Sequence, residues 1–85
     1  MKRIKLKYTT DVARVSKEDY EALSLYQWHL HITPDGMKYA RAKVSINGYV
    51  YMHDLIKPTS KNQHIVHRDN NGLNNTRLNL KKESR

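Results

Sequence analysis

The chain has 85 residues, of which 38% are hydrophobic, enough for one thin core and too few for a second domain. Cysteine is absent, which excludes disulfides, thiolate zinc sites and cysteine nucleophiles. The apolar runs are too short to cross a membrane, and the first ten residues lack the apolar stretch of a signal peptide. We therefore expect a cytoplasmic protein with no membrane partner.

The charge is unevenly distributed along the chain. Sixteen Lys and Arg against eight Asp and Glu give a net charge of +8. Residues 1–15 carry +4 (five basic, one acidic), residues 16–56 carry −1 (four and five), and residues 57–85 carry +5 (seven and two). Two basic ends favour a polyanion partner. Nucleic acid is favoured over a membrane surface, because no amphipathic helix with a wide apolar face accompanies the charge. The alternative is a positively charged surface without such a partner.

The first third of the chain predicts two strands and a short helix. Charged and apolar residues alternate over 3–8, which is typical of a half-buried strand, and a second short strand covers 12–15. Ser16, followed by acidic residues, predicts a helix that begins there and ends near Tyr26. Its core-facing residues would be Tyr20 and Leu23, with Leu25 as a further candidate.

Residues 28–52 predict a three-stranded antiparallel meander. Apolar residues alternate with His29 and His31 in the first strand. Pro34-Asp35-Gly36 is typical of a turn, and Asn47-Gly48 is the strongest hairpin signal in the chain. The second strand would run over 37–46 and the third over 49–52.

The remaining segments predict a short helix, an extended piece, a polar loop and a final helix. The short helix covers 53–56 and is ended by Pro58. Residues 64–67 are extended, and residues 68–75 form a polar loop. Thr76 or Asn75 would cap a helix running through Leu78 and Leu80. Together the segments predict a single α+β domain over 1–85, with a β-rich part at 1–56 and a motif-bearing part at 64–85.

The motif-bearing part starts with His67, followed two positions on by Asp69 and twelve positions on by Asn79-Leu80, with Asn74-Asn75 between them. This pattern resembles the central motif of HNH homing-type endonucleases common in phages, including AP2-HNH-like members. Further matches run from about residue 12 onward, at Glu18 to Trp28, Tyr39-Ala40 and Met52 to Ile56. The resemblance implies a phage-encoded protein in which a small meander is followed by an HNH-like ββα unit of two strands and a helix.

The resemblance also implies roles for individual residues. His67 matches the general base, with a buried core histidine as the alternative, and Asn79 matches the asparagine that braces the ββα unit and helps to orient that base. Asp69, Asn74 and Asn75 would shape the loop. Phosphodiester cleavage needs such a base together with a divalent cation.

The expected metal ligands of the family do not match this chain. The ligand before the base histidine is an Asp or His in the family, whereas Val66 stands here, and the second ligand would follow beyond Arg85. His64 and Asp69 are the remaining candidates. We therefore expect no cofactor, or a weakly bound Mg²⁺ or Mn²⁺ ion if the protein is active.

Other polar and aromatic residues have two interpretations each. The basic residues expected to contact phosphates, with a solvated surface as the alternative, are Arg68, Arg77, Lys81, Lys82 and Arg85. The aromatic residues that could stack on bases, but more often fill a core, are Tyr26, Trp28, Tyr39, Tyr49 and Tyr51. His29 and His31 lack a third metal ligand nearby, and His53 suits a structural or phosphate-side role.

The leading hypothesis is a small basic HNH-fold protein that binds nucleic acid, with DNA as the expected partner and with impaired cleavage. One alternative is an active metal-dependent HNH endonuclease that nicks DNA. Another is a phage inhibitor that binds a host enzyme. The sequence leaves enzymatic activity, the identity of a protein partner and the oligomeric state open.

Overall fold

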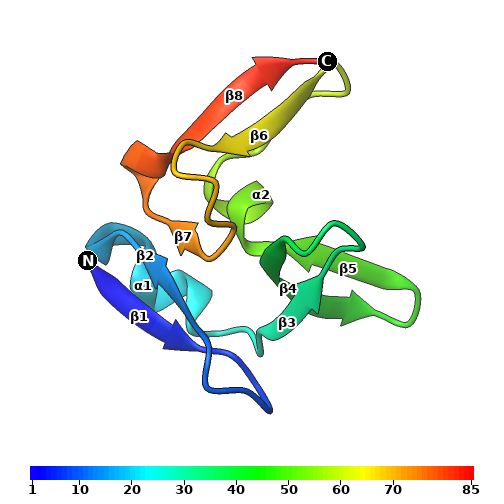
Figure 1. Ribbon diagram of the computed structural model, residues 1–85. Coiled ribbons are helices and arrows are strands. Elements are labelled where there is room, and N and C mark those ends of the chain that lie inside the picture. Colours follow the sequence, from blue (N-terminus) through cyan, green and yellow to red (C-terminus); the bar gives the residue numbers. More distant parts are fainter.

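The computed structural model describes residues 1–85 and confirms the predicted α+β class. Eight strands form three small sheets in the orders β1-β2-β7, β3-β4-β5 and β6-β8, accompanied by two short α-helices and one 3-10 helix. Figure 1 shows α2 between the three sheets and α1 beside β1 and β2. None of the helices has the length and apolar character that a membrane crossing requires.

The first sheet joins the two ends of the chain. β1 (Lys2–Lys5) pairs antiparallel with β2 (Val12–Val15), as the alternation predicted. β7 (Asn74–Asn75) then pairs with β2 in parallel, so the polar loop is attached directly to the N-terminal segment. Ile4, Ala13 and Val15 are buried on the inner face of this sheet.

Helix α1 (Lys17–Leu23) lies where it was predicted, but it buries different residues. Leu23 is buried, whereas Tyr20 is partly exposed and Leu25 is 85% exposed, so the expected core positions of Tyr20 and Leu25 are wrong. The inward position is occupied instead by Asp19, which forms an ion pair with Arg77. Ser16 occupies the N-cap position, but its hydroxyl accepts a hydrogen bond from Arg77 N rather than from the helix.

The predicted meander is confirmed. It consists of β3 (His29–Ile32), β4 (Lys38–Ser45) and β5 (Gly48–Tyr51), all antiparallel. Gly36 takes a φ of +89°, the left-handed conformation that the turn after Pro34 needs. The second turn is formed by Ile46 and Asn47, with a register shift between Lys43 and Ser45.

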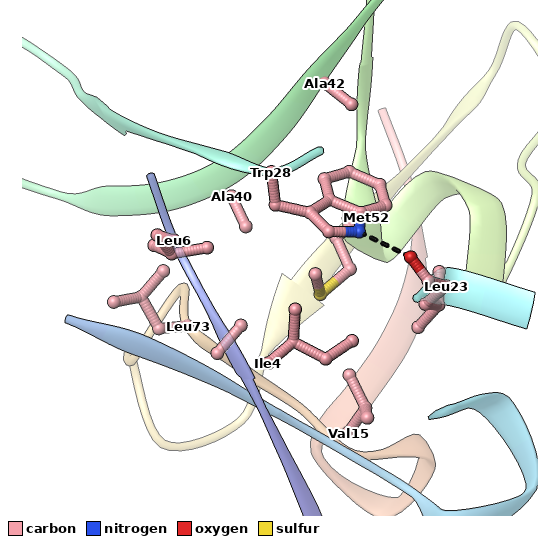
Figure 2. Close-up of a cluster of buried hydrophobic side chains, with 10 residues drawn as sticks. Ile4, Leu6, Val15, Leu23, Trp28, Ala40, Ala42, Met52 and Leu73 are labelled. Carbon is pink, nitrogen blue, oxygen red and sulfur yellow. Dashed lines mark hydrogen bonds between the residues drawn. The ribbon is translucent and has the colours of Figure 1, made fainter. Parts of the chain in front are cut away.

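The core lies between the first sheet, the meander and the two helices (Figure 2). Trp28 and Met52 are its largest buried side chains, and Met52 begins the short helix α2 (Met52–Ile56). The inward residues of β4 are Ala40 and Ala42, whose small side chains leave room for the indole ring of Trp28. The ring nitrogen Nε1 of Trp28 donates a hydrogen bond of 2.8 Å to the Leu23 carbonyl, which satisfies its buried polar atom.

The predicted final helix is wrong. Residues Arg77–Asn79 form only a 3-10 turn, and β8 (Leu80–Ser84) follows as a strand antiparallel to β6 (Gln63–His67). A helix of so few residues is marginal in water, whereas a strand here satisfies the backbone groups of β6 over its whole length. The expected HNH-like ββα unit is therefore replaced by a two-stranded sheet closed by the polar loop.

Candidate functional site

The polar loop 68–75 is held together by its own side chains. The side-chain amide of Asn79 donates hydrogen bonds to Asp69 Oδ1 at 2.9 Å and to the Asn74 carbonyl at 2.7 Å, while its oxygen accepts one from Asp69 N at 3.1 Å. Asn74 Nδ2 donates to the second carboxylate oxygen of Asp69 at 2.9 Å. Asn79 thus braces the loop from the 3-10 turn, where the sequence analysis expected a helix.

His67 ends β6 and is 5% exposed. Its Nε2 lies 2.7 Å from Oδ1 of Asn75, which is fully buried on β7. No hydrogen bond joins His67 to the side chain of Asn79, and the side chain that is hydrogen-bonded to the imidazole is that of Asn75. The strand pairing of β7 with β2 explains this, because it fixes Asn75 beside the end of β6.

Aromatic rings enclose the His67 imidazole. The ring of His53 lies edge-on to it at a centroid distance of 5.1 Å, and the ring of Tyr39 lies at 5.7 Å. His53 is stacked on Tyr51 at 5.2 Å with an interplanar angle of 17°. Sequence reasoning treated these residues separately, and only the register of β4 and β5 with α2 brings them together.

Burial sets the protonation of both histidines. It lowers the pKa of His67 below the ordinary value, although the hydrogen bond to Asn75 Oδ1 and the charge of Asp69 oppose this change. Burial, together with the charge of His67, lowers the pKa of His53 to about 4. Both rings are therefore neutral at pH 7. With Asn75 Oδ1 as the acceptor, His67 carries its proton on Nε2 and leaves Nδ1 as its basic nitrogen.

The two candidate metal ligands do not meet at this histidine. Asp69 Oδ1 accepts hydrogen bonds from Asn71 N and Asn79 Nδ2, and its other oxygen is bound by Asn74. His64 lies three residues before His67 on β6, and strand alternation directs the two side chains to opposite faces. The chain contains no group of three or more His, Asp or Glu side chains that could hold a metal ion.

The basic residues selected near the C-terminus differ in their surroundings. Arg77 forms a two-pronged ion pair with Asp19, with bonds of 3.0 Å from Nε and 2.7 Å from Nη2. Lys81 lies 3.4 Å from Glu83, and Arg85 Nε donates a hydrogen bond to the Gln63 carbonyl. Only Arg68 and Lys82 of this group are exposed without an ion pair or side-chain hydrogen bond. The helix end expected to present these cations together does not form.

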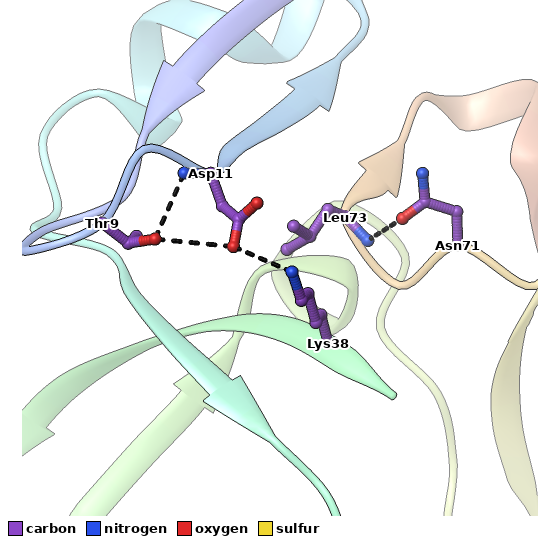
Figure 3. Close-up of polar contacts among 5 residues, drawn as sticks. All are labelled: Thr9, Asp11, Lys38, Asn71 and Leu73. Carbon is purple, nitrogen blue, oxygen red and sulfur yellow. Dashed lines mark hydrogen bonds and ion pairs between the residues drawn. The ribbon is translucent and has the colours of Figure 1, made fainter. Parts of the chain in front are cut away.

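A cationic groove lies instead on the outer face of the first sheet. It encloses about 490 Å³ and is lined by Arg3, Arg14 and Lys38 together with Thr10, Asp11, Val12, Asn71 and Leu73. Arg3 and Arg14 are directly opposite each other across β1 and β2, and neither has a carboxylate partner. The single carboxylate of the groove, Asp11, is paired with Lys38 at 3.2 Å and with Thr9 (Figure 3).

The polar loop forms one wall of this groove. Asn71 Oδ1 accepts a hydrogen bond from Leu73 N (Figure 3), so the amide hydrogens of Asn71 remain free to donate. Sequence reasoning marked residues 1–15 as basic but did not select Arg3 or Arg14. The signal was present in their spacing, because both occupy outward positions of adjacent predicted strands.

The remaining aromatic candidates divide between core and surface. Trp28 is buried and Tyr26 packs against it, whereas Tyr49 is 54% exposed on β5. His29 and His31 lie beside Tyr8 and Tyr51, respectively. These neighbours are aromatic rings, so the surroundings of the two histidines resemble a stacking surface more than a ligand set.

Comparison with known proteins gives no further guide to the site. No protein-family model, no curated protein and no solved structure matches the chain.

Proposed function

We propose that this protein binds nucleic acid, with duplex DNA as its main partner, through phosphate contacts in the groove of Arg3, Arg14 and Lys38. The observation that carries the proposal is the direct opposition of Arg3 and Arg14. Like charges at directly opposed strand positions destabilise a sheet, so this pair lowers the stability of the free protein. A bound phosphate between the two guanidinium groups removes that repulsion and accepts hydrogen bonds from both.

The groove is polar and open enough for a backbone phosphate. Its cations outnumber its carboxylates, and Asp11 is already neutralised by Lys38. Contacts of this kind recognise the backbone and not the bases, so the expected binding has little sequence preference. The excess of basic residues in 1–15 and 57–85 adds a longer-range electrostatic attraction between the protein and the negatively charged nucleic acid.

We further propose an HNH-related origin with impaired cleavage. His67 keeps the position of the general base, but it is 5% exposed behind the rings of His53 and Tyr39, which restrict access of a phosphate to it. The neighbouring carboxylate of Asp69 is engaged in three hydrogen bonds within the loop. Val66 offers no donor atom next to the histidine.

One feature favours the alternative of a nicking endonuclease. His67 is neutral and its Nδ1 is basic, which is the state a general base requires. A nicking assay on supercoiled plasmid with Mg²⁺, Mn²⁺, Ni²⁺ or Zn²⁺ separates the two proposals. We expect no more than trace nicking, and turnover that His67→Ala abolishes would establish the nuclease instead.

DNA binding itself is tested by fluorescence anisotropy with a labelled duplex of about 20 base pairs. The double variant Arg3→Gln/Arg14→Gln should bind on the order of tenfold more weakly or worse at low salt, because each lost phosphate contact forgoes counterion release. The control is Lys17→Gln/Lys61→Gln, which removes the same charge at exposed positions outside the groove. Equal losses in both variants would show that net charge, and not the groove, carries the binding.

A further inference from the structure

The outward face of the meander gathers aromatic and cationic side chains. Ala40 and Ala42 of β4 point into the core, so Arg41 and Lys43 point outward by strand alternation. The register places Arg41 opposite His29 on one side, and Lys43 opposite Tyr49 on the other.

These side chains surround a shallow hollow of about 330 Å³ lined by His29, Leu30, Arg41, Lys43 and Tyr49. No carboxylate lines it. The Arg41 guanidinium lies 4.2 Å from the centre of the Tyr49 ring, a stacked arrangement that holds a flat cation beside a half-exposed aromatic ring.

Tyr8, in the loop between β1 and β2, extends this surface. Its ring lies 6.2 Å from that of His29, and the residue is 94% exposed. Its φ of +62° lies in the left-handed region, which is unfavourable for a bulky residue. An exposed ring contributes little to the core, so the strain at Tyr8 is not repaid by packing. Strain of this kind is typical of positions kept for binding.

We propose that this stacking face, made of Tyr8, His29, Arg41, Lys43 and Tyr49, binds a segment of nucleic acid whose bases are unpaired. The bases would stack on Tyr49 and Tyr8, and the phosphates would meet Arg41 and Lys43. The bases of a duplex stack on one another and do not present their faces to a protein, so the stacking face selects single strands. This inference rests on the proposed function and adds to the duplex-binding groove a second surface, which takes unpaired segments of the nucleic acid.

The charge of the surface favours this partner over a protein or an apolar ligand. Arg41 and Lys43 form no ion pair, and of the aromatic rings near them Tyr49 is about half exposed and Tyr8 almost fully exposed. A cationic surface with interleaved aromatic rings suits a ligand that alternates flat rings with negative charges, as a single strand does.

The test compares two single-stranded probes of equal length and charge, an oligothymidylate and its abasic analogue, by fluorescence anisotropy. We expect the wild-type protein to bind the oligothymidylate on the order of tenfold more tightly per stacked base. Tyr49→Leu should remove most of this preference, because it keeps an apolar side chain and loses the ring. The matched control is Tyr20→Leu, since Tyr20 is a partly exposed tyrosine on α1, outside the stacking face, and its variant should keep the preference. Circular dichroism verifies that both variants are folded.

The outcomes distinguish this inference from the proposed function. Equal affinity of the wild type for the two probes, or a preference that survives in Tyr49→Leu, overturns base stacking. Salt-dependent duplex binding would leave the phosphate groove standing in either case. If neither single strand nor duplex binds, the proposed function fails and the inference fails with it.

Discussion

Truncation of Asn79 tests the bracing of the polar loop. Its side chain makes three hydrogen bonds, two to Asp69 and one to the Asn74 carbonyl, and the residue is 8% exposed. A hydrogen bond of this kind contributes about 1 kcal/mol net, and buried groups left unpaired add to the loss. Asn79→Ala should therefore lower the free energy of unfolding by about 2–3 kcal/mol. For a domain of this size the melting temperature should fall by roughly 10 °C or more.

The assay is urea denaturation followed by the fluorescence of Trp28, with thermal unfolding as a second measurement. Asn62→Ala is the control, because Asn62 is exposed and its side chain makes no hydrogen bond. Its free energy of unfolding should lie within about 0.5 kcal/mol of the wild-type value. A free energy of unfolding for Asn79→Ala that equals that of Asn62→Ala would refute the bracing role.

Two further changes test the surroundings of His67. The pKa of His53 lies at about 4, below its ordinary value of 6.5, because burial and the charge of His67 oppose its protonation. As the pH falls, His53 therefore binds a proton in the unfolded chain before it does so in the folded protein. The neutral His53 contributes its full stabilisation above pH 6.5, and the free energy of unfolding decreases by about 3 kcal/mol as the pH falls to 4. Urea denaturation across this range should show the loss, and His53→Phe should reduce it; a slope that the substitution leaves unchanged would contradict the assignment. Gly72→Ala should lower the free energy of unfolding by about 1–3 kcal/mol or more, because the new methyl group would collide with the Lys38 carbonyl oxygen and the Tyr39 ring. Thermal unfolding checks this. If Gly72→Ala melts at the same temperature as the wild type, the loop and β4 do not pack closely at Gly72.

Local sequence signals predicted much of the fold. Residues 29–51 alternate and are divided by turn residues such as Gly36, so the meander could be predicted without knowledge of its neighbours. Pro58 set the end of α2 in the same way. These elements depend on residues within a few positions of one another.

The final helix could not be rejected from local signals. Leu78 is 91% exposed and Leu80 is 1% exposed, and a spacing of two residues is compatible with a strand or with a helix end. The pairing of β8 with β6 decides between them, and this pairing joins residues that the loop separates in sequence. The ion pair of Arg77 with Asp19 could not be predicted either, because the two residues are 58 positions apart in the sequence.

The candidate site was predicted in part. The spacing of His67 and Asn79 indicated that the loop between them forms part of a site. The backbone groups of so polar a loop need side-chain hydrogen-bond partners, and Asn79 and Asp69 provide them. The contact of His67 with Asn75, and the groove between Arg3 and Arg14, depend on how β7 and β1 each pair with β2. Strand partners of this kind are set by tertiary packing, which single-residue patterns do not encode.

The salt dependence of duplex binding tests the central claim most directly. The slope of log K against log salt becomes less steep by about 0.9 for each phosphate contact that is removed. If Arg3 and Arg14 each contact a phosphate, Arg3→Gln/Arg14→Gln should reduce the slope by about 1.8 relative to the wild type, whereas Lys17→Gln/Lys61→Gln should leave it nearly unchanged. A slope that is the same in the wild type and in Arg3→Gln/Arg14→Gln would contradict phosphate binding in the groove.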